Sequence, residues 1–161
     1  MLVALREEGL GRAAQTAPNG RGASGVADDG YPAMLRDRAL LSDDALHRAL
    51  LIHRETGERL DAVVTRLGMI SEDRLAAEAA DHAGLPLIGA MDFPRAPVGD
   101  VDLSPAFLRD SRVLPVAVSE DHVRVAVCDP FDPFVMSAFA FLFRRRVERV
   151  VARSTDIDAA I

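Results

Sequence analysis

The chain has 161 residues, of which 49% are hydrophobic, and its 25 acidic and 19 basic residues give a net charge of −6. This acidic balance and the absence of Trp argue against a nucleic-acid-binding protein. All basic residues are Arg, so the lysine of a phosphate-binding P-loop is missing and these residues are not a P-loop ATPase. The single cysteine, Cys128, excludes an internal disulfide and fits a reducing cytoplasm.

The beginning of the chain predicts no folded element. Residues 11–30 combine Gly, Ala and polar residues without an apolar period, so residues 1–29 are interpreted as a flexible leader. The longest nearly apolar run, residues 134–143, is far shorter than the roughly 20 residues that a spanning helix needs. The sequence therefore predicts no direct membrane span and no secretory signal.

An internal repeat with an offset of 29 residues relates residues 30–53 to residues 59–82. A repeat of this length is one supersecondary unit used twice, because a single helical hairpin cannot bury its own apolar face. The identical pairs are Ala33 and Ala62, Ser42 and Ser71, Asp44 and Asp73, Leu46 and Leu75, and His53 and His82.

Each copy of the repeat predicts a short helix followed by a longer one. Ser42 and Ser71 are both followed by two acidic residues, which is typical of a helix N-cap and its first turn. Shorter helical segments precede them at residues 31–38 and 59–67. We therefore predict a helical tandem-repeat subdomain of four helices over residues 30–88.

After residue 88 the pattern changes to that of a small α/β subdomain. Two Val-rich alternating runs within residues 113–128 predict a β-hairpin, and the apolar segment 134–143 predicts a buried helix. A third strand in VERVVAR and a last helix opened by Thr155 complete a β-β-α-β order over residues 89–161. The predicted fold class is therefore α+β, with a four-helix tandem-hairpin subdomain followed by a small α/β subdomain.

The segment RLDAVVTRLGMISEDRLAAEAADHAGLPLI, which begins at Arg59, resembles the N-terminal domain of the ATPases that drive type II secretion and type IV pilus assembly. The segment from residue 113 to residue 161 is similar to the second half of that domain, with its strand, Asp-Pro, helix, Arg-Val strand and final Ile-rich helix. The resemblance extends over residues 30–161, and the same domain also occurs fused to other enzymes, including some glycosyltransferases. The matching residues in the second repeat are Arg59, Leu60, Val64, Gly68, Ile70 and Leu75.

The resemblance implies a non-catalytic module of a longer protein. In the family this domain docks on the cytoplasmic part of a membrane-anchored partner and couples a hexameric cytoplasmic ATPase to the inner-membrane platform. The expected partners are therefore that platform protein and an ATPase core in the same full-length chain. The expected location is the cytoplasm, peripheral to the inner membrane through the partner, and no cofactor is implied.

Some members of the family bind cyclic di-GMP, with the Arg of each tandem motif on a guanine and glycines that let the backbone approach. Arg59, Leu60 and Gly68 match that pattern here. Because Asp61 repels a dianionic ligand and the first repeat lacks the Arg, cyclic di-GMP sensing is the second hypothesis and docking the first. The departures from the family pattern are Asp61 and His82 in the second repeat and Gly30, Pro32, Ala39 and His53 in the first.

Two other groups of residues are interpreted as structural. His53 and His82 fall at equivalent helix ends without the carboxylate or Cys cluster of a metal site, which favours an interaction with the helix dipole. Cys128 and His122 share a predicted strand, but their separation of roughly 20 Å favours a buried core cysteine over a Cys-His nucleophile. No catalytic constellation is recognised, so an independent enzyme is the weakest of the three hypotheses.

A surface for a partner is predicted at the helix over residues 134–143 and the arginines that follow it. This helix is apolar nearly all round, so either a second element buries its other face or that face is exposed for a partner. We expect Phe139, Phe143, Arg144 and Arg145 to contact the partner. The arginines are also compatible with lipid headgroups, or with an ordinary solvated strand edge.

Overall fold

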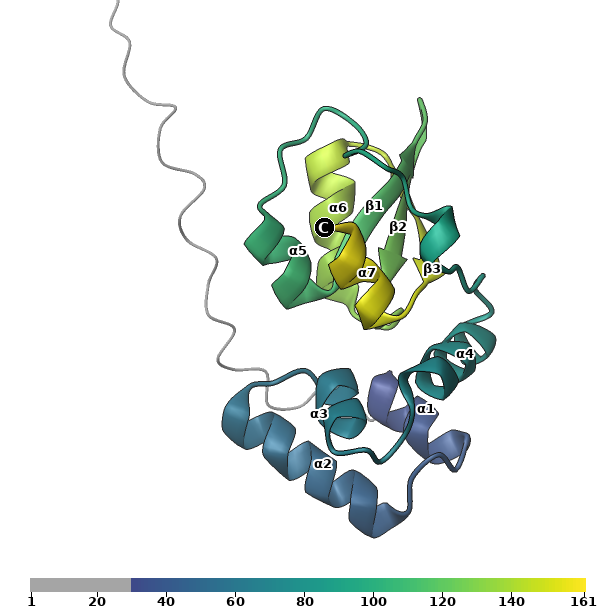
Figure 1. Cartoon of the computed structure of the whole chain (residues 1–161), viewed down its shortest axis with the longest axis vertical. Helices are drawn as coiled ribbons and strands as arrows, with labels where there is room; N and C mark the ends of the chain where they lie inside the picture. The colour runs from purple at the N-terminus through teal and green to yellow at the C-terminus, as the bar shows by residue number, and fades with distance from the viewer. Residues whose placement is uncertain (1–29) are drawn as a thin grey trace, which may run out of the picture.

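The computed structural model describes residues 30–161, so the leader predicted over residues 1–29 lies outside the described residues. Helices α1–α4 form one half of the molecule, the helical half, and the strands with α5–α7 form the other, the sheet half (Figure 1). In chain order the elements are α1 (Tyr31–Asp37), α2 (Asp43–Thr56), α3 (Leu60–Arg66), α4 (Glu72–Ala83), the 3-10 helix η1 (Ala90–Asp92), α5 (Pro105–Ser111), β1 (Val113–Val118), β2 (His122–Val127), α6 (Pro133–Phe143), β3 (Arg146–Val151) and α7 (Ser154–Ala160).

The helical half contains the predicted repeat. Helix α3 begins 29 residues after α1, and α4 begins 29 residues after α2, which is the offset of the repeat. The hydroxyl oxygens of Ser42 and Ser71 each accept a hydrogen bond from the amide three residues on, at 3.3 and 3.4 Å. Gly57 and Gly84 end the two longer helices in the left-handed conformation. The four predicted helices and both serine caps are therefore confirmed.

The sheet half has mixed topology. Strands β1 and β2 pair antiparallel, with Val113 opposite Val127, and a register irregularity lies between Pro115 and Ala117. Strands β2 and β3 pair in parallel, because α6 carries the chain back across the sheet between them. The resulting order is β1-β2-β3, and with the helical half it confirms the predicted α+β fold class.

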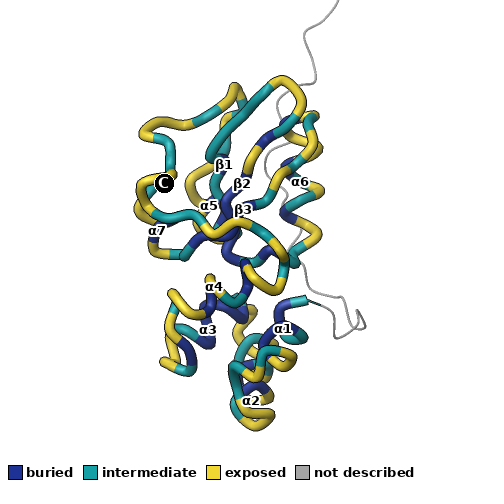
Figure 2. Tube along the Cα trace, turned by 90° about the vertical axis from the view of Figure 1, so that its right-hand side faces the viewer, coloured by how far each residue is buried: buried dark blue, intermediate teal, exposed yellow. Residues whose placement is uncertain are grey.

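A different helix packs on each face of the sheet. Helix α6 packs on one face through Val135, Phe139 and Phe143, which are buried with the valines of β2. Helix α7 packs on the other face, where Ile157 is buried with Ala126 and Val150. Figure 2 shows α6 and α7 on opposite sides of the strands. The 3-10 helix η1, which the sequence did not predict, contacts α7, and its three residues are too few to show a helical period.

The helical half has its own core, which also includes a residue of the sheet. Helices α1–α4 bury aliphatic side chains against one another, and Val151 at the end of β3 belongs to the same cluster. Leu87, in the segment after α4, forms an isolated bridge with Val151. Among residues 30–161 no helix is long and apolar enough to cross a membrane.

The turn between the two helices of each repeat requires a left-handed residue. In the second repeat Gly68 supplies it with a φ of 65°, whereas the equivalent residue of the first repeat is Ala39 with a φ of 48°. Ala39 is exposed, so its methyl group contributes little to packing. A side chain with a Cβ is strained in this conformation.

We expect Ala39→Gly to raise the free energy of unfolding by about 0.5–1 kcal/mol, because it removes this strain. Urea unfolding of the 161-residue chain with an unchanged m-value measures the effect. Gly68→Ala is the matched reverse change, since nothing lies within 4 Å of the Cβ it would add, and it should lower stability. A loss of stability in Ala39→Gly would contradict the argument.

Candidate functional site

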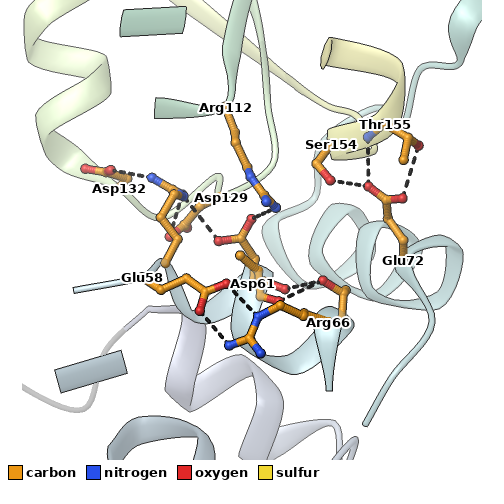
Figure 3. Close-up of polar contacts among 12 residues, drawn as sticks. Glu58, Asp61, Arg66, Glu72, Arg112, Asp129, Asp132, Ser154 and Thr155 are labelled. Atoms are coloured by element: carbon orange, nitrogen blue, oxygen red, sulfur yellow. Dashed lines mark hydrogen bonds and ion pairs between the residues drawn. The ribbon is translucent and has the colours of Figure 1, made fainter. Parts of the chain in front are cut away.

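The two halves meet at a buried carboxylate in the first turn of α3. Asp61 is buried, and its Oδ1 accepts a hydrogen bond from Nε of Arg59 at 3.1 Å. Its Oδ2 accepts one from Nη1 of Arg112, also at 3.1 Å, as Figure 3 shows. Arg112 follows α5 and belongs to the sheet half. Both oxygens of the buried carboxylate are thus satisfied by charged donors, one from each half.

The loop between β2 and α6 adds two more carboxylates to the same place. Nη2 of Arg59 lies 3.6 Å from Oδ2 of Asp129, and its Nη1 lies 3.6 Å from Oδ2 of Asp132. Arg59 therefore faces three carboxylates, counting that of Asp61. We call Arg59, Asp61, Arg112, Asp129 and Asp132 the polar junction. Its formal charge is two positive against three negative, so it does not present a free cation to an anionic ligand.

Burial within the polar junction changes the protonation of Asp129. Loss of solvent raises the pKa of this carboxyl to about 6, although the hydrogen bond from the amide of Phe131 and the charge of Arg59 act in the opposite direction. Burial also raises the pKa of the Cys128 thiol, which therefore stays protonated at neutral pH. The predicted role of Cys128 as a buried core residue is confirmed.

The same loop places an aromatic side chain in the helical half. The ring of Phe131 lies edge-on to those of Tyr31 and His82, with centroid distances of 6.1 and 5.7 Å. His53, the equivalent of His82, instead has its Nδ1 2.6 Å from the carbonyl oxygen of Glu58. The two histidines have separate structural contacts, and among residues 30–161 no group of three His, Cys, Asp or Glu residues is arranged to hold a metal ion.

A second set of polar contacts joins α4 to α7. The carboxylate of Glu72 accepts hydrogen bonds from the Ser154 hydroxyl and from the amide and hydroxyl of Thr155, the last two at 2.9 and 3.0 Å (Figure 3). Nη1 of Arg153 lies 2.8 Å from Oδ1 of Asp73. Both carboxylates come from the acidic first turn that follows the Ser71 cap, so this helix start also connects the two halves.

The residues predicted to contact cyclic di-GMP do not line one cavity. Arg59 and Leu60 line a groove of about 320 Å³ together with Gly30, and Leu60 is itself buried in the core. Gly68 lines a different groove of about 580 Å³, beside Arg66. At the position equivalent to Arg59 the first repeat has Gly30, with a φ of 122° and no side chain.

The predicted partner residues of α6 need correction. Phe139 and Phe143 are buried against the sheet, so neither ring is available to a partner. The exposed apolar side chains of this helix are Phe134 and Phe141, on the side away from the sheet, and Leu142 at its flank, which are 64, 82 and 41% exposed. We call these three the outer α6 face. The helix is thus apolar on both sides, as the sequence indicated.

The arginines after α6 have few interactions. Arg144 is exposed at the end of the helix, and its side chain forms no hydrogen bond or ion pair within the described part of the chain. Nε of Arg145 donates to the carbonyl oxygen of Glu120 at 3.2 Å. Arg146 is 85% exposed and lies 3.8 Å from Asp121. We call residues 144–146 the arginine run.

The sequence did not predict the polar junction as a whole. Nothing in it indicated that Arg112, Asp129 and Asp132 lie beside Arg59 and Asp61. An available signal was the place of Asp61 among the apolar residues of α3, where a carboxylate that becomes buried requires a cationic partner. No signal in the sequence identified which distant arginine that partner would be.

We expect the stability contributed by Asp129 to fall as the pH rises. Its folded-state pKa exceeds the usual Asp value, so the folded chain binds an extra proton between about pH 4 and pH 6. The stability that this proton contributes is fully present below about pH 4 and is lost as the pH rises through about 6. Asn does not ionise, so Asp129→Asn avoids this loss. The difference in unfolding free energy between the variant and the wild type should therefore rise by roughly 2 kcal/mol, in favour of the variant, from pH 4 to pH 7. Urea unfolding across this range, with the exposed Asp158→Asn as control, measures it, and parallel curves would contradict it.

Parts of this chain are similar in sequence to a known domain family and to characterised proteins. Residues 83–161 match the family described as the MshEN domain. The chain is 34% identical over 109 residues to the type IV pilus assembly ATPase PilB of Thermus thermophilus, which covers 66% of this chain and 12% of PilB. It is 33% identical over 108 residues to the type II secretion system protein E of Xanthomonas campestris pv. campestris, covering 65% of this chain and 19% of that protein.

Solved structures agree with the sequence relatives. The N-terminal domain of XpsE superposes with a TM-score of 0.67 at 26% identity, covering 86% of this chain and 96% of that chain. The structure of MshE with cdg superposes with a TM-score of 0.57 at 27% identity, covering 81% of this chain and 98% of that chain. Residues 83–161 therefore belong to the MshEN domain family, and the chain is homologous to the N-terminal region of the type IV pilus and type II secretion ATPases.

Proposed function

We propose that this chain is the non-catalytic docking and regulatory domain of a type II secretion or type IV pilus ATPase. In this role it binds the cytoplasmic part of an inner-membrane platform protein, and it lies in the cytoplasm at the membrane through that partner. One observation carries the proposal. The chain covers 96% of the XpsE N-terminal domain but only 12–22% of the curated ATPase relatives. The catalytic core of the proposed enzyme then lies elsewhere in the full-length protein.

The connection between the halves suits a docking domain. The polar junction, the Glu72 and Asp73 contacts and the ring of Phe131 all join the helical half to the sheet half. A partner that binds one half therefore also displaces the other, which allows the domain to transmit position without chemistry of its own. The proposed domain boundary remains that of the sequence, with residues 30–88 helical and residues 89–161 carrying the sheet.

We expect removal of residues 1–161 from the full-length ATPase to abolish its association with inner-membrane vesicles that contain the platform, while the remaining core still hydrolyses ATP. Co-sedimentation with these vesicles and phosphate release measure the two properties. Vesicles prepared without the platform protein are the control. Retention of the truncated enzyme on the platform vesicles would rule out the docking role.

Cyclic di-GMP sensing is the second candidate, because the structure of MshE with cdg superposes on most of this chain. The residues that would take part are Arg59, Leu60 and Gly68. The three carboxylates around Arg59 disfavour it, since a phosphodiester would have to displace Asp129 and Asp132 and then lie beside Asp61.

We therefore expect no micromolar binding when cyclic di-GMP is titrated into the 161-residue chain and the heat is measured by calorimetry. Arg59→Ala serves as the control for any heat that is observed. Binding that disappears in Arg59→Ala would make the domain a second-messenger sensor and overturn the preference for docking.

A further inference from the structure

The outer α6 face is a linear feature with regular spacing. Phe134 and Phe141 are seven residues apart, which is two helical turns or about 10.5 Å along one side of the helix. The residues between them on this side are small, with Ser137 and Ala138 in the intervening turn. Two exposed rings separated by small side chains permit the close approach of a second helix, as in packing of ridges into grooves.

The arginine run lies at the C-terminal end of this surface and is poorly neutralised. No acidic residue occurs between residues 133 and 147. Glu148 forms its ion pair with Arg124 on β2, at 3.2 Å, and not with the arginine run. Within residues 30–161 the run has a single ion pair, that of Arg146 with Asp121 at 3.8 Å. With Asp121 offsetting Arg146, a local charge of about +2 on a chain with a net charge of −6 is complementary to acidic side chains.

The dimensions of the surface favour a protein over a lipid bilayer. Only three large apolar side chains are exposed on α6, because its other side is occupied by the contact with the sheet. A helix that lies in a membrane interface needs a broad apolar face and basic residues along its length. Here the basic residues follow only one end of the helix, and the remainder of the chain is acidic.

We propose that the outer α6 face and the arginine run bind an acidic amphipathic helix of the partner. The partner helix packs its apolar side chains, spaced two turns apart, against Phe134 and Phe141, and its carboxylates pair with Arg144 and Arg146. This inference rests on the proposed docking function and specifies the chemistry of the partner segment. The aromatic contacts supply most of the affinity, and the arginines fix the direction of the partner helix.

The test uses the 161-residue chain and a labelled synthetic peptide of about 18 residues, or five helical turns. The peptide carries Leu at two-turn spacing on one side and Glu elsewhere, and a second peptide has Lys in place of Glu. We expect the acidic peptide to bind and to shift the NMR signals of the outer α6 face. Phe141→Ser and the double change Arg144→Glu with Arg146→Glu should each weaken binding about tenfold or more.

Two matched changes on exposed residues away from α6 should leave binding unchanged. Met91→Ser removes an apolar side chain that is 98% exposed on η1, and Arg74→Glu reverses an exposed charge on α4. Equal binding of the Lys peptide, or NMR shifts confined to other elements, would overturn the proposal. Binding of anionic phospholipid vesicles that requires Phe141 would also overturn it, in favour of a lipid surface.

Failure of this inference is distinguishable from failure of the docking function. Phe141→Ser is also placed in the full-length ATPase and tested on the platform vesicles. If the wild-type ATPase binds and the variant binds equally well, the docking function remains and the α6 surface is wrong. If the wild-type ATPase does not bind, the docking function is wrong, and the peptide titration still reports the specificity of α6.

Discussion

The buried carboxylate of Asp61 is the constraint on which the arrangement of the two halves depends. An unpaired ionised carboxylate in this position would be strongly unfavourable, so Arg59 and Arg112 must both be present and correctly placed. Arg112 reaches Asp61 only when the turn between α5 and β1 lies beside α3. The ion pairs therefore contribute to the choice of one relative orientation, whereas the aliphatic core of α1–α4 and Val151 supplies most of the burial.

The polar junction also limits what this surface can bind. In a protein that takes an anionic ligand at such a place, the arginine side chain has to be free or weakly paired. Here Asp129 and Asp132 occupy the neighbourhood of Arg59, and Gly30 supplies no second cation. The similarity to MshE thus extends to the fold, while the charges at the repeat starts favour internal pairing. Exposed apolar and basic side chains are found instead on and after α6.

Local features of this fold were predictable from the sequence, whereas long-range contacts were not. The serine caps, the repeat offset and the Val-rich hairpin each depend on residues within a few positions of one another, so their patterns are visible in the chain. The contact between Asp61 and Arg112 spans 51 residues, and nothing in either segment specifies the other. The error over Phe139 and Phe143 has a similar cause, because a helix that is apolar all round gives no indication of which side meets the sheet.

The segment Asp129–Pro133 joins β2 directly to α6, and this continuity has a mechanical consequence. Asp129 lies 3.6 Å from Arg59 of the helical half, and the ring of Phe131 contacts that of Tyr31. The last residue of the segment, Pro133, is the first residue of α6. Helix α6 is also held along its length by the side chains that it buries against the sheet. A force applied to its exposed side is therefore transmitted both to the sheet and, through this segment, to the tandem repeat.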